Sequence, residues 1–232
     1  MLTNRWDAAL AEFERAISLD PDYTVSYRAS MPALYMLGRS DDAVARGAVA
    51  ARLDPLSPTT FALYSLALLN ANRRTEALAA ARRGVELDSL NALAQAQLGV
   101  AEYFAGHADI AAAAERRVVR EPHTSLWIGF VRAATGDRAG AAALITDLEH
   151  ERGRNVHAET AIAWTYLGAG DTTRALDALE RAARAREPLA FVAPFGHPAY
   201  DGVRQSARFA AVMRAFGVDG SRFTTRVPTA PR

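Results

Sequence analysis

The feature that most constrains this chain is a spacing of 34 residues that recurs along most of its length. The stretch from Gly38 to Asn72 contains one full period, which reads as a helix, a proline-broken turn and a second helix. A period of this size is typical of stacked helical hairpins. Its landmarks are small or helix-ending residues at matching offsets: Ala9, Ala43, Ala77 and Ala111; Ala16 and Ala50; Asp20-Pro21 and Asp54-Pro55; Gly38, Asn72 and Gly106.

Apolar residues at helical spacing predict paired helices throughout the repeat. Gly38, Asn72 and Gly106 each follow the first helix of a pair, where a left-handed helix end favours Gly or Asn. Between Gly106 and Gly136 the interval is four residues shorter, and we place this loss in the second helix of that pair. The expected helices are 4–19, 23–37, 41–53, 59–71, 75–87, 92–105, 109–120, 124–135, 139–149, 156–169, 173–186 and 206–216.

These helices predict an all-α fold, a right-handed solenoid of stacked antiparallel hairpins with a C-terminal capping helix. We expect a half hairpin over 1–21, the repeat array over 22–187, a cap over 188–217 and a flexible tail over 218–232. The half hairpin lacks its own first helix, so Leu10, Phe13 and Ile17 are expected to be exposed. An uncovered apolar face of this kind predicts a concentration-dependent homodimer or a docked partner at the N-terminal helix.

Composition excludes several classes of function. The chain of 232 residues has a net charge of +1 and no Cys, which favours neither nucleic acid nor an anionic membrane surface and leaves no thiol chemistry. No apolar run is long enough to span a bilayer and no signal peptide is evident, so we expect a cytoplasmic protein.

The residues up to about Arg186 resemble the tetratricopeptide repeat (TPR) family. Leu98-Gly99, followed by Tyr103 and Gly106, is similar to the first-helix pattern of that family. The second-helix pattern is matched by Ala9, Phe13, Ala16 and Pro21. The resemblance implies a non-enzymatic module that binds other proteins.

The end of the chain resembles the tail that closes repeat arrays in many bacterial signalling proteins. Those arrays follow a winged-helix domain, a nucleotide cyclase domain or a Ser/Thr kinase domain. The alternative function is therefore the detached sensor region of a larger bacterial regulator. The matching residues are His197-Pro198, Tyr200-Asp201, Val203-Arg204 and Arg208-Phe209.

In a stacked array the first helices line a concave groove, which we expect to bind a peptide or a helix through apolar and aromatic anchors. Cations are few there, which disfavours the clamp that related repeat proteins use for acidic chaperone tails. The predicted groove residues are Arg28, Tyr35, Met36, Leu66, Leu69, Asn70, Val100, Tyr103, Phe104, Leu126, Phe130 and Trp164.

Residues suited to catalysis or metal binding do not form a recognisable motif. His123 and His157 begin neighbouring first helices, but packed helices lie roughly 8 to 10 Å apart, which is long for two ligands of one zinc ion. No phosphate-binding loop, nucleophile elbow or HExxH sequence occurs. We therefore expect no catalytic, cofactor or metal site, and we interpret the arginine clusters as solvated helix faces.

Overall fold

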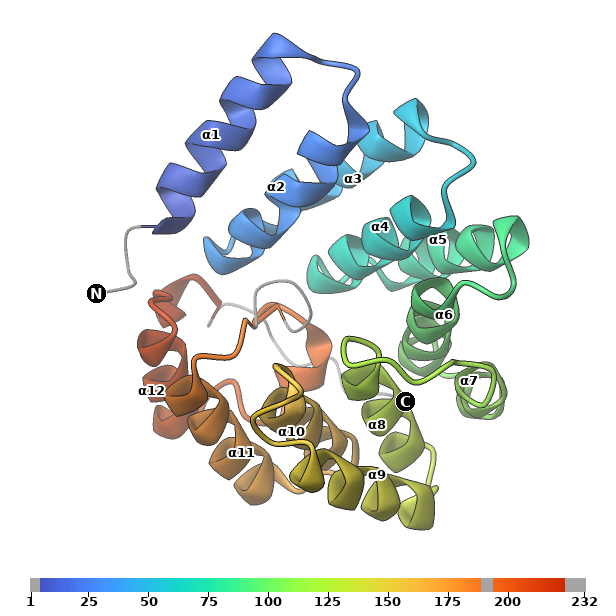
Figure 1. Ribbon diagram of the computed structural model, residues 1–232, viewed down its shortest axis with the longest axis vertical. Helices are drawn as coiled ribbons and strands as arrows, with labels where there is room; N and C mark the ends of the chain where they lie inside the picture. Colours follow the sequence, from blue (N-terminus) through green and yellow to red (C-terminus); the bar gives the residue numbers. More distant parts are fainter. Residues whose placement is uncertain (1–4, 189–193, 224–232) are drawn as a thin grey trace.

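The computed structural model describes residues 5–188 and 194–223. These residues form an array of helices joined by turns and short connections (Figure 1). No strand occurs within these two ranges. The elements are α1 (Arg5–Leu19), α2 (Thr24–Met36), α3 (Ser40–Leu53), α4 (Pro58–Asn70), α5 (Arg74–Leu87), α6 (Ala92–Phe104), α7 (Ala108–Glu115), α8 (Ser125–Ala134), α9 (Arg138–His150), α10 (Ala158–Gly168), α11 (Thr172–Ala185), η2 (Pro198–Tyr200), α12 (Ala207–Ala215) and η3 (Gly220–Phe223).

The helices pack in chain order as antiparallel hairpins. Figure 1 shows the hairpins following one another around a ring, with α12 returning toward the side of the ring where α1 and α2 lie. The first helices α2, α4, α6, α8 and α10 contact their successors, so the inner wall is continuous from one hairpin to the next. This arrangement confirms the predicted all-α array of stacked hairpins. None of the described helices has the length and hydropathy needed to cross a membrane.

The turn inside each hairpin has the predicted left-handed residue. Gly38, Asn72 and Gly106 have φ of 69°, 59° and 91°. In the first of these turns the amide of Arg39 donates to the carbonyl of Leu34 at 2.9 Å, which is the six-to-one bond of a Schellman helix end. Equivalent bonds close the other four hairpins, so the same local chemistry sets the turn inside each hairpin.

Eleven of the twelve helices lie within about two residues of their predicted bounds, and α7 is the exception. It was expected to reach residue 120 but ends at Glu115 after 8 residues. The shortened interval therefore does fall in this second helix, and residues 116–124 form an irregular connection instead. Pro122 excludes the preceding residue from helical geometry, and the Thr124 hydroxyl donates to the carbonyls of Val119 and Glu121 to close that connection.

The repeated alanines lie where helices approach most closely. Ala43, Ala77 and Ala111 are fully buried. The hydroxyl of Ser65 in α4 donates to the carbonyl of Ala77 in α5 at 2.8 Å, so the two helices approach closely at this point. Small residues at the repeat interval therefore set the distance between helices.

The N-terminal helix is better covered than predicted. Leu10 was expected to be exposed, but only 6% of it is accessible because α1 packs against α2, and this expectation was wrong. Phe13 and Ile17 are half-buried. An ion pair between Glu14 and Arg46 of α3 adds to the contact. The expected dimer through this helix stays a prediction.

The C-terminal cap extends further than predicted. Helix α12 packs on α11, and Arg208 pairs with Asp177 and Glu180 of that helix. Val218 and Phe223 are buried although both lie in the stretch predicted to be a flexible tail, because each is apolar and finds cover in the core. The boundary at 217 therefore falls inside packed structure, while residues 224–232 lie outside the described ranges.

Candidate peptide-binding face

The predicted groove residues do lie on the first helices of successive hairpins, and most of them are buried. We call this surface, formed by α2, α4, α6, α8 and α10, the inner face. Arg28, Tyr103 and Phe104 are half-buried, and Arg28 donates to the Thr60 hydroxyl at 3.1 Å. The other nine are at most 3% exposed: Tyr35, Met36, Leu66, Leu69, Asn70, Val100, Leu126, Phe130 and Trp164.

Aromatic side chains from three consecutive first helices form a continuous series across this face. The rings of Tyr103 and Phe130 meet edge to face with centroids 5.4 Å apart, and Phe104 stacks on Phe130 at 5.5 Å. Phe130 in turn contacts Trp164 at 5.8 Å. These separations are those of favourable aromatic pairs. The sequence repeat thus brings together side chains that are 34 residues or fewer apart along the chain.

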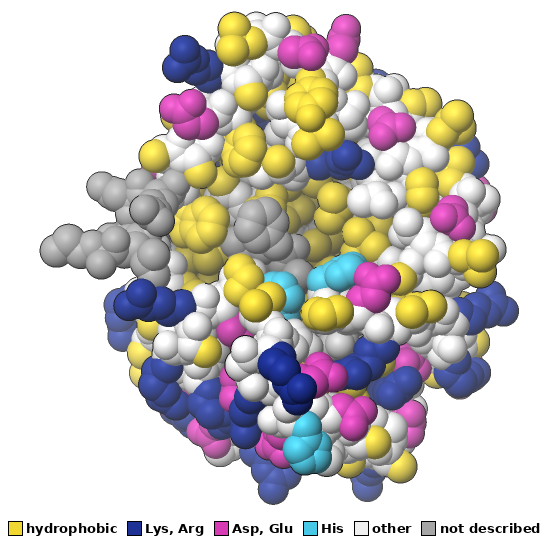
Figure 2. Space-filling view, in the orientation of Figure 1, with side chains coloured by type: hydrophobic (Ala, Val, Ile, Leu, Met, Phe, Trp, Pro, Cys, Tyr) yellow, Lys and Arg dark blue, Asp and Glu magenta, His cyan; other side chains and the backbone are white. Residues whose placement is uncertain are grey.

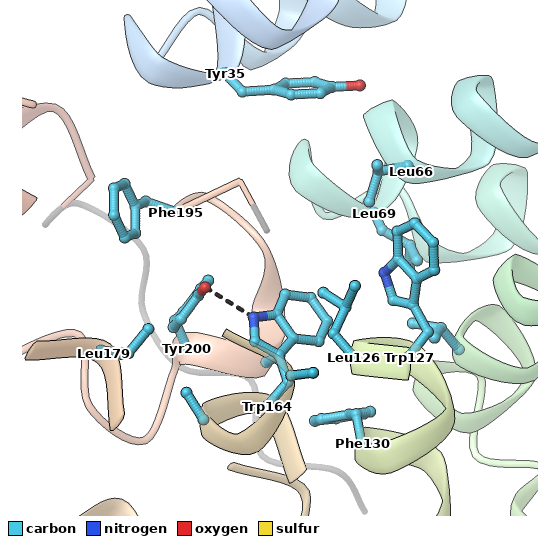
Figure 3. Packing of buried hydrophobic residues seen from close by; sticks show 14 of the residues in the cluster. Tyr35, Leu66, Leu69, Leu126, Trp127, Phe130, Trp164, Leu179, Phe195 and Tyr200 are labelled. Carbon is cyan, nitrogen blue, oxygen red and sulfur yellow. Dashed lines mark hydrogen bonds between the residues drawn. The ribbon is translucent and has the colours of Figure 1, made fainter. Parts of the chain in front are cut away.

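The chain's own C-terminal part occupies this face. We call residues 194–204 the return segment. His197 lies between two rings of the inner face, 5.4 Å from Phe104 and 4.8 Å from Trp164 between centroids, and it is fully buried. In Figure 3, Tyr200 approaches Trp164 from the opposite side to Phe130. The burial of the groove residues therefore reflects, in part, a segment of the same polypeptide.

Specific polar contacts accompany the aromatic ones. The indole nitrogen of Trp164 donates to the Tyr200 hydroxyl at 2.8 Å, the dashed bond in Figure 3. Burial raises the pKa of Tyr200 well above its ordinary value, so this hydroxyl stays protonated. A Cβ placed on Gly196 would lie 2.4 Å from the side-chain oxygen of Asn70. Only glycine fits there without displacing that amide.

The return segment holds its own shape through a buried arginine. Arg204 is 3% exposed and donates to the carbonyl of Phe195 at 2.6 Å and to that of His197 at 2.9 Å. Its guanidinium also pairs with Asp201 at 2.9 Å. Several backbone carbonyls of the return segment thus accept hydrogen bonds from a side chain of the same segment.

A second contact joins the C-terminal residues to the first hairpin. Arg222 donates from Nη1 to the carbonyl of Leu37 at 2.9 Å, and a Cβ added to Gly38 would lie 2.8 Å from the Cβ of Arg222. Between the two parts remains a cavity of about 280 Å³. Its lining residues are Gly38, Ser40, Asp41, Ala71, Gly196, Arg204, Arg222 and Phe223.

The sequence did not predict that His197 and Tyr200 contact the inner face. The segment was assigned to a cap on the last hairpin, which α12 does provide. A signal existed, since Phe195, His197 and Tyr200 place three rings within a stretch rich in Gly and Pro. Such a stretch has no helical period, so nothing in its pattern indicated which surface those rings would contact.

The histidines lie on different helices and connections of the described chain. Within residues 5–188 and 194–223, no group of three or more metal-ligating side chains comes together. His157 is 9% exposed, and burial lowers its pKa, with nearby His123 as a smaller cause. Its Nδ1 has no hydrogen-bond partner among the described residues.

No family model and no curated protein matches the sequence. Among solved structures the chain is similar to MamA, at 17% sequence identity over 80% of this chain and 91% of that chain, with a TM-score of 0.44. It is also similar to YrrB, described as a TPR protein with an unusual peptide-binding site, at 16% identity over 78% and 95% of the two chains, again with a TM-score of 0.44.

The class of the protein follows from the chain itself. Hairpins recur mostly at a 34-residue interval, each reverses through a Schellman turn, and the repeat alanines Ala43, Ala77 and Ala111 are buried. The chain is an all-α repeat protein with the fold of a stacked-hairpin solenoid. Its inner face differs from an open groove in that part of the same chain covers it.

Proposed function

We propose that this chain is a protein-interaction module without catalytic activity, and that its inner face binds a peptide segment of another protein. The observation that supports this proposal most directly is the seat of His197 between Phe104 and Trp164. The face therefore has the shape and the ring edges needed to hold an irregular peptide. Aromatic side chains are common where binding energy is concentrated.

The accessible part of the inner face lies at its Tyr103 edge. Tyr103 and Phe104 are half-buried, and the Arg74 guanidinium lies 5.7 Å from the centre of the Phe104 ring. Figure 2 shows hydrophobic and histidine side chains around a hollow at the centre of this view, with most basic side chains nearer the lower rim. A partner at this edge would therefore meet both aromatic surface and the Arg74 guanidinium. The expected bacterial origin and cytoplasmic location stay predictions.

A displayed library of random 12-residue peptides tests this function. We expect peptides selected on the full chain to lose about tenfold or more in affinity for the Tyr103→Ala variant, because Tyr103 contributes ring contacts at the edge of the face. Tyr23→Ala is the matched control, since Tyr23 is 53% exposed in the turn between α1 and α2. Selected peptides that bind both variants equally, or a library that yields no binder, would contradict the proposal.

A further inference from the structure

The return segment touches the inner face as a bound peptide would. We propose that it is a built-in ligand, and that the partner segment bound in trans has the same chemistry. That chemistry is a turn-forming, proline-containing stretch with a small residue before a histidine and an aromatic hydroxyl three residues after it. This inference rests on the proposed function and names the kind of peptide that the face selects.

The contacts of the face define three requirements on such a peptide. Phe104 and Trp164 flank a flat ring, which His197 supplies here. The Trp164 indole needs a hydrogen-bond acceptor, which is the Tyr200 hydroxyl. A buried donor left without an acceptor is costly, so this position discriminates between tyrosine and phenylalanine.

The third requirement is steric. Gly196 lies against the Asn70 side chain so closely that a Cβ would come within 2.4 Å of its oxygen. The amide of Asn70 is itself held, because its nitrogen donates to the Ser40 hydroxyl at 2.9 Å. A peptide with any larger residue at the position of Gly196 must move this bonded pair.

The return segment can leave the face with much of its internal bonding intact. Arg204 ties the carbonyls of Phe195 and His197 to Asp201, all within the segment. The amide of Ala199 donates to Nδ1 of His197 at 3.2 Å, and Pro198 fixes the start of the short helix η2. Among the contacts of the described residues, displacement of the segment therefore exposes its rings and leaves the Trp164 indole without its acceptor.

A labelled peptide with the sequence of residues 194–204, PFGHPAYDGVR, tests the proposal on full-length protein. In the wild type the tethered segment competes at an effective concentration on the order of millimolar. We expect the His197→Ala, Tyr200→Ala double variant to bind the peptide at least tenfold more tightly than the wild type does. A control peptide with alanine at the histidine and tyrosine positions should not bind. Equal binding of the two peptides, or no binding by a folded double variant, would overturn the inference.

A second measurement applies if the double variant does not fold. The chain has no Cys, so a single introduced thiol reports on local opening. Ala199 is 9% exposed in the return segment, and Ala161 is fully buried in α10. We expect Ala199→Cys to react with a thiol reagent at least tenfold faster than Ala161→Cys under native conditions. Equal rates would mean that the return segment opens only when the whole protein unfolds, which would contradict the inference.

The outcomes separate this inference from the proposed function. If library peptides bind through Tyr103 while the 194–204 peptide does not bind the double variant, the inference fails and the binding function survives. If no peptide of either origin binds, both fail.

Discussion

At the scale of the residue, side-chain size and burial decide what each position tolerates. Ala43, Ala77 and Ala111 are small because neighbouring helices leave no space beside them. Gly196 is small because a bonded amide lies directly against it. The sequence predicted the alanines, since their period shows which positions are equivalent. It did not predict the constraint on Gly196, because the neighbour that imposes it is Asn70, more than a hundred residues earlier.

Enlarging a repeat alanine should destabilise the array. Ala77→Leu adds three carbon atoms at a fully buried contact and is expected to lower the free energy of unfolding by about 1 to 3 kcal/mol. Urea denaturation measures the change. Ala79→Leu on the exposed side of the same helix is the control and should stay within about 0.5 kcal/mol of the wild type. Equal effects of the two substitutions would mean that the contact is not tight.

Buried His157 should make the protein sensitive to acid. Burial lowers its pKa in the folded chain, so the unfolded chain binds the proton at a higher pH, and stability falls as the pH drops below about 6.5. His157→Gln removes this linkage. We expect the urea midpoint of the wild type to decrease relative to that of the variant between pH 7.5 and pH 5. Exposed His150→Gln is the control and should track the wild type. A wild-type midpoint that rises relative to His157→Gln on acidification would contradict the assignment.

At the scale of the element, the backbone groups at helix ends are hydrogen-bonded either by neighbouring residues or by residues distant in sequence. The hairpin turns use residues next to the helix, which is why Gly38, Asn72 and Gly106 could be assigned from sequence. Helix α10 differs, because its N-cap residue His157 makes no side-chain capping bond. The carboxylate of Glu187, beyond the end of α11, accepts the amides of Glu159 and Thr160 instead, each at 2.9 Å.

Neutralising this distant cap should weaken α10. In Glu187→Gln one oxygen becomes an amide nitrogen that cannot accept, so a buried donor at the start of α10 loses its partner at a cost of about 1 to 3 kcal/mol. Burial raises the pKa of Glu187, with its hydrogen bonds opposing the shift, so the comparison belongs at neutral pH. Urea denaturation is the measurement, and exposed Glu12→Gln is the control. A stability equal to that of the control would show that the carboxylate is not the cap.

At the scale of the whole molecule, the array is closed by contacts between its two ends. Arg222 reaches the carbonyl of Leu37 across 185 positions of sequence, and the return segment fills the inner face between these ends. The hairpins set the radius of the ring, while the C-terminal part holds its first and last members together. Access to the inner face therefore depends on contacts that lie outside the repeat.

Removing the Arg222 contact should loosen the return segment without unfolding the hairpins. Arg222 is half exposed, so we expect Arg222→Ala to cost about 1 kcal/mol, equivalent to roughly fivefold in the opening equilibrium. The thiol of Ala199→Cys should therefore react roughly fivefold faster in the Arg222→Ala background. Exposed Arg214→Ala on α12 is the control. An unchanged rate would show that the two ends do not hold the segment in place.

The sequence by itself determined most of the helices and their hairpin turns, because a 34-residue period and helix-end residues act over short range. It could not determine the early end of α7, the cap from Glu187 or the cover over the inner face. Those depend on contacts between residues such as His197 and Phe104, which share no period and meet only when the ring is formed. The repeated residues specify how the hairpins stack on one another. The position of the non-repeating return segment depends instead on its contacts with the folded hairpins.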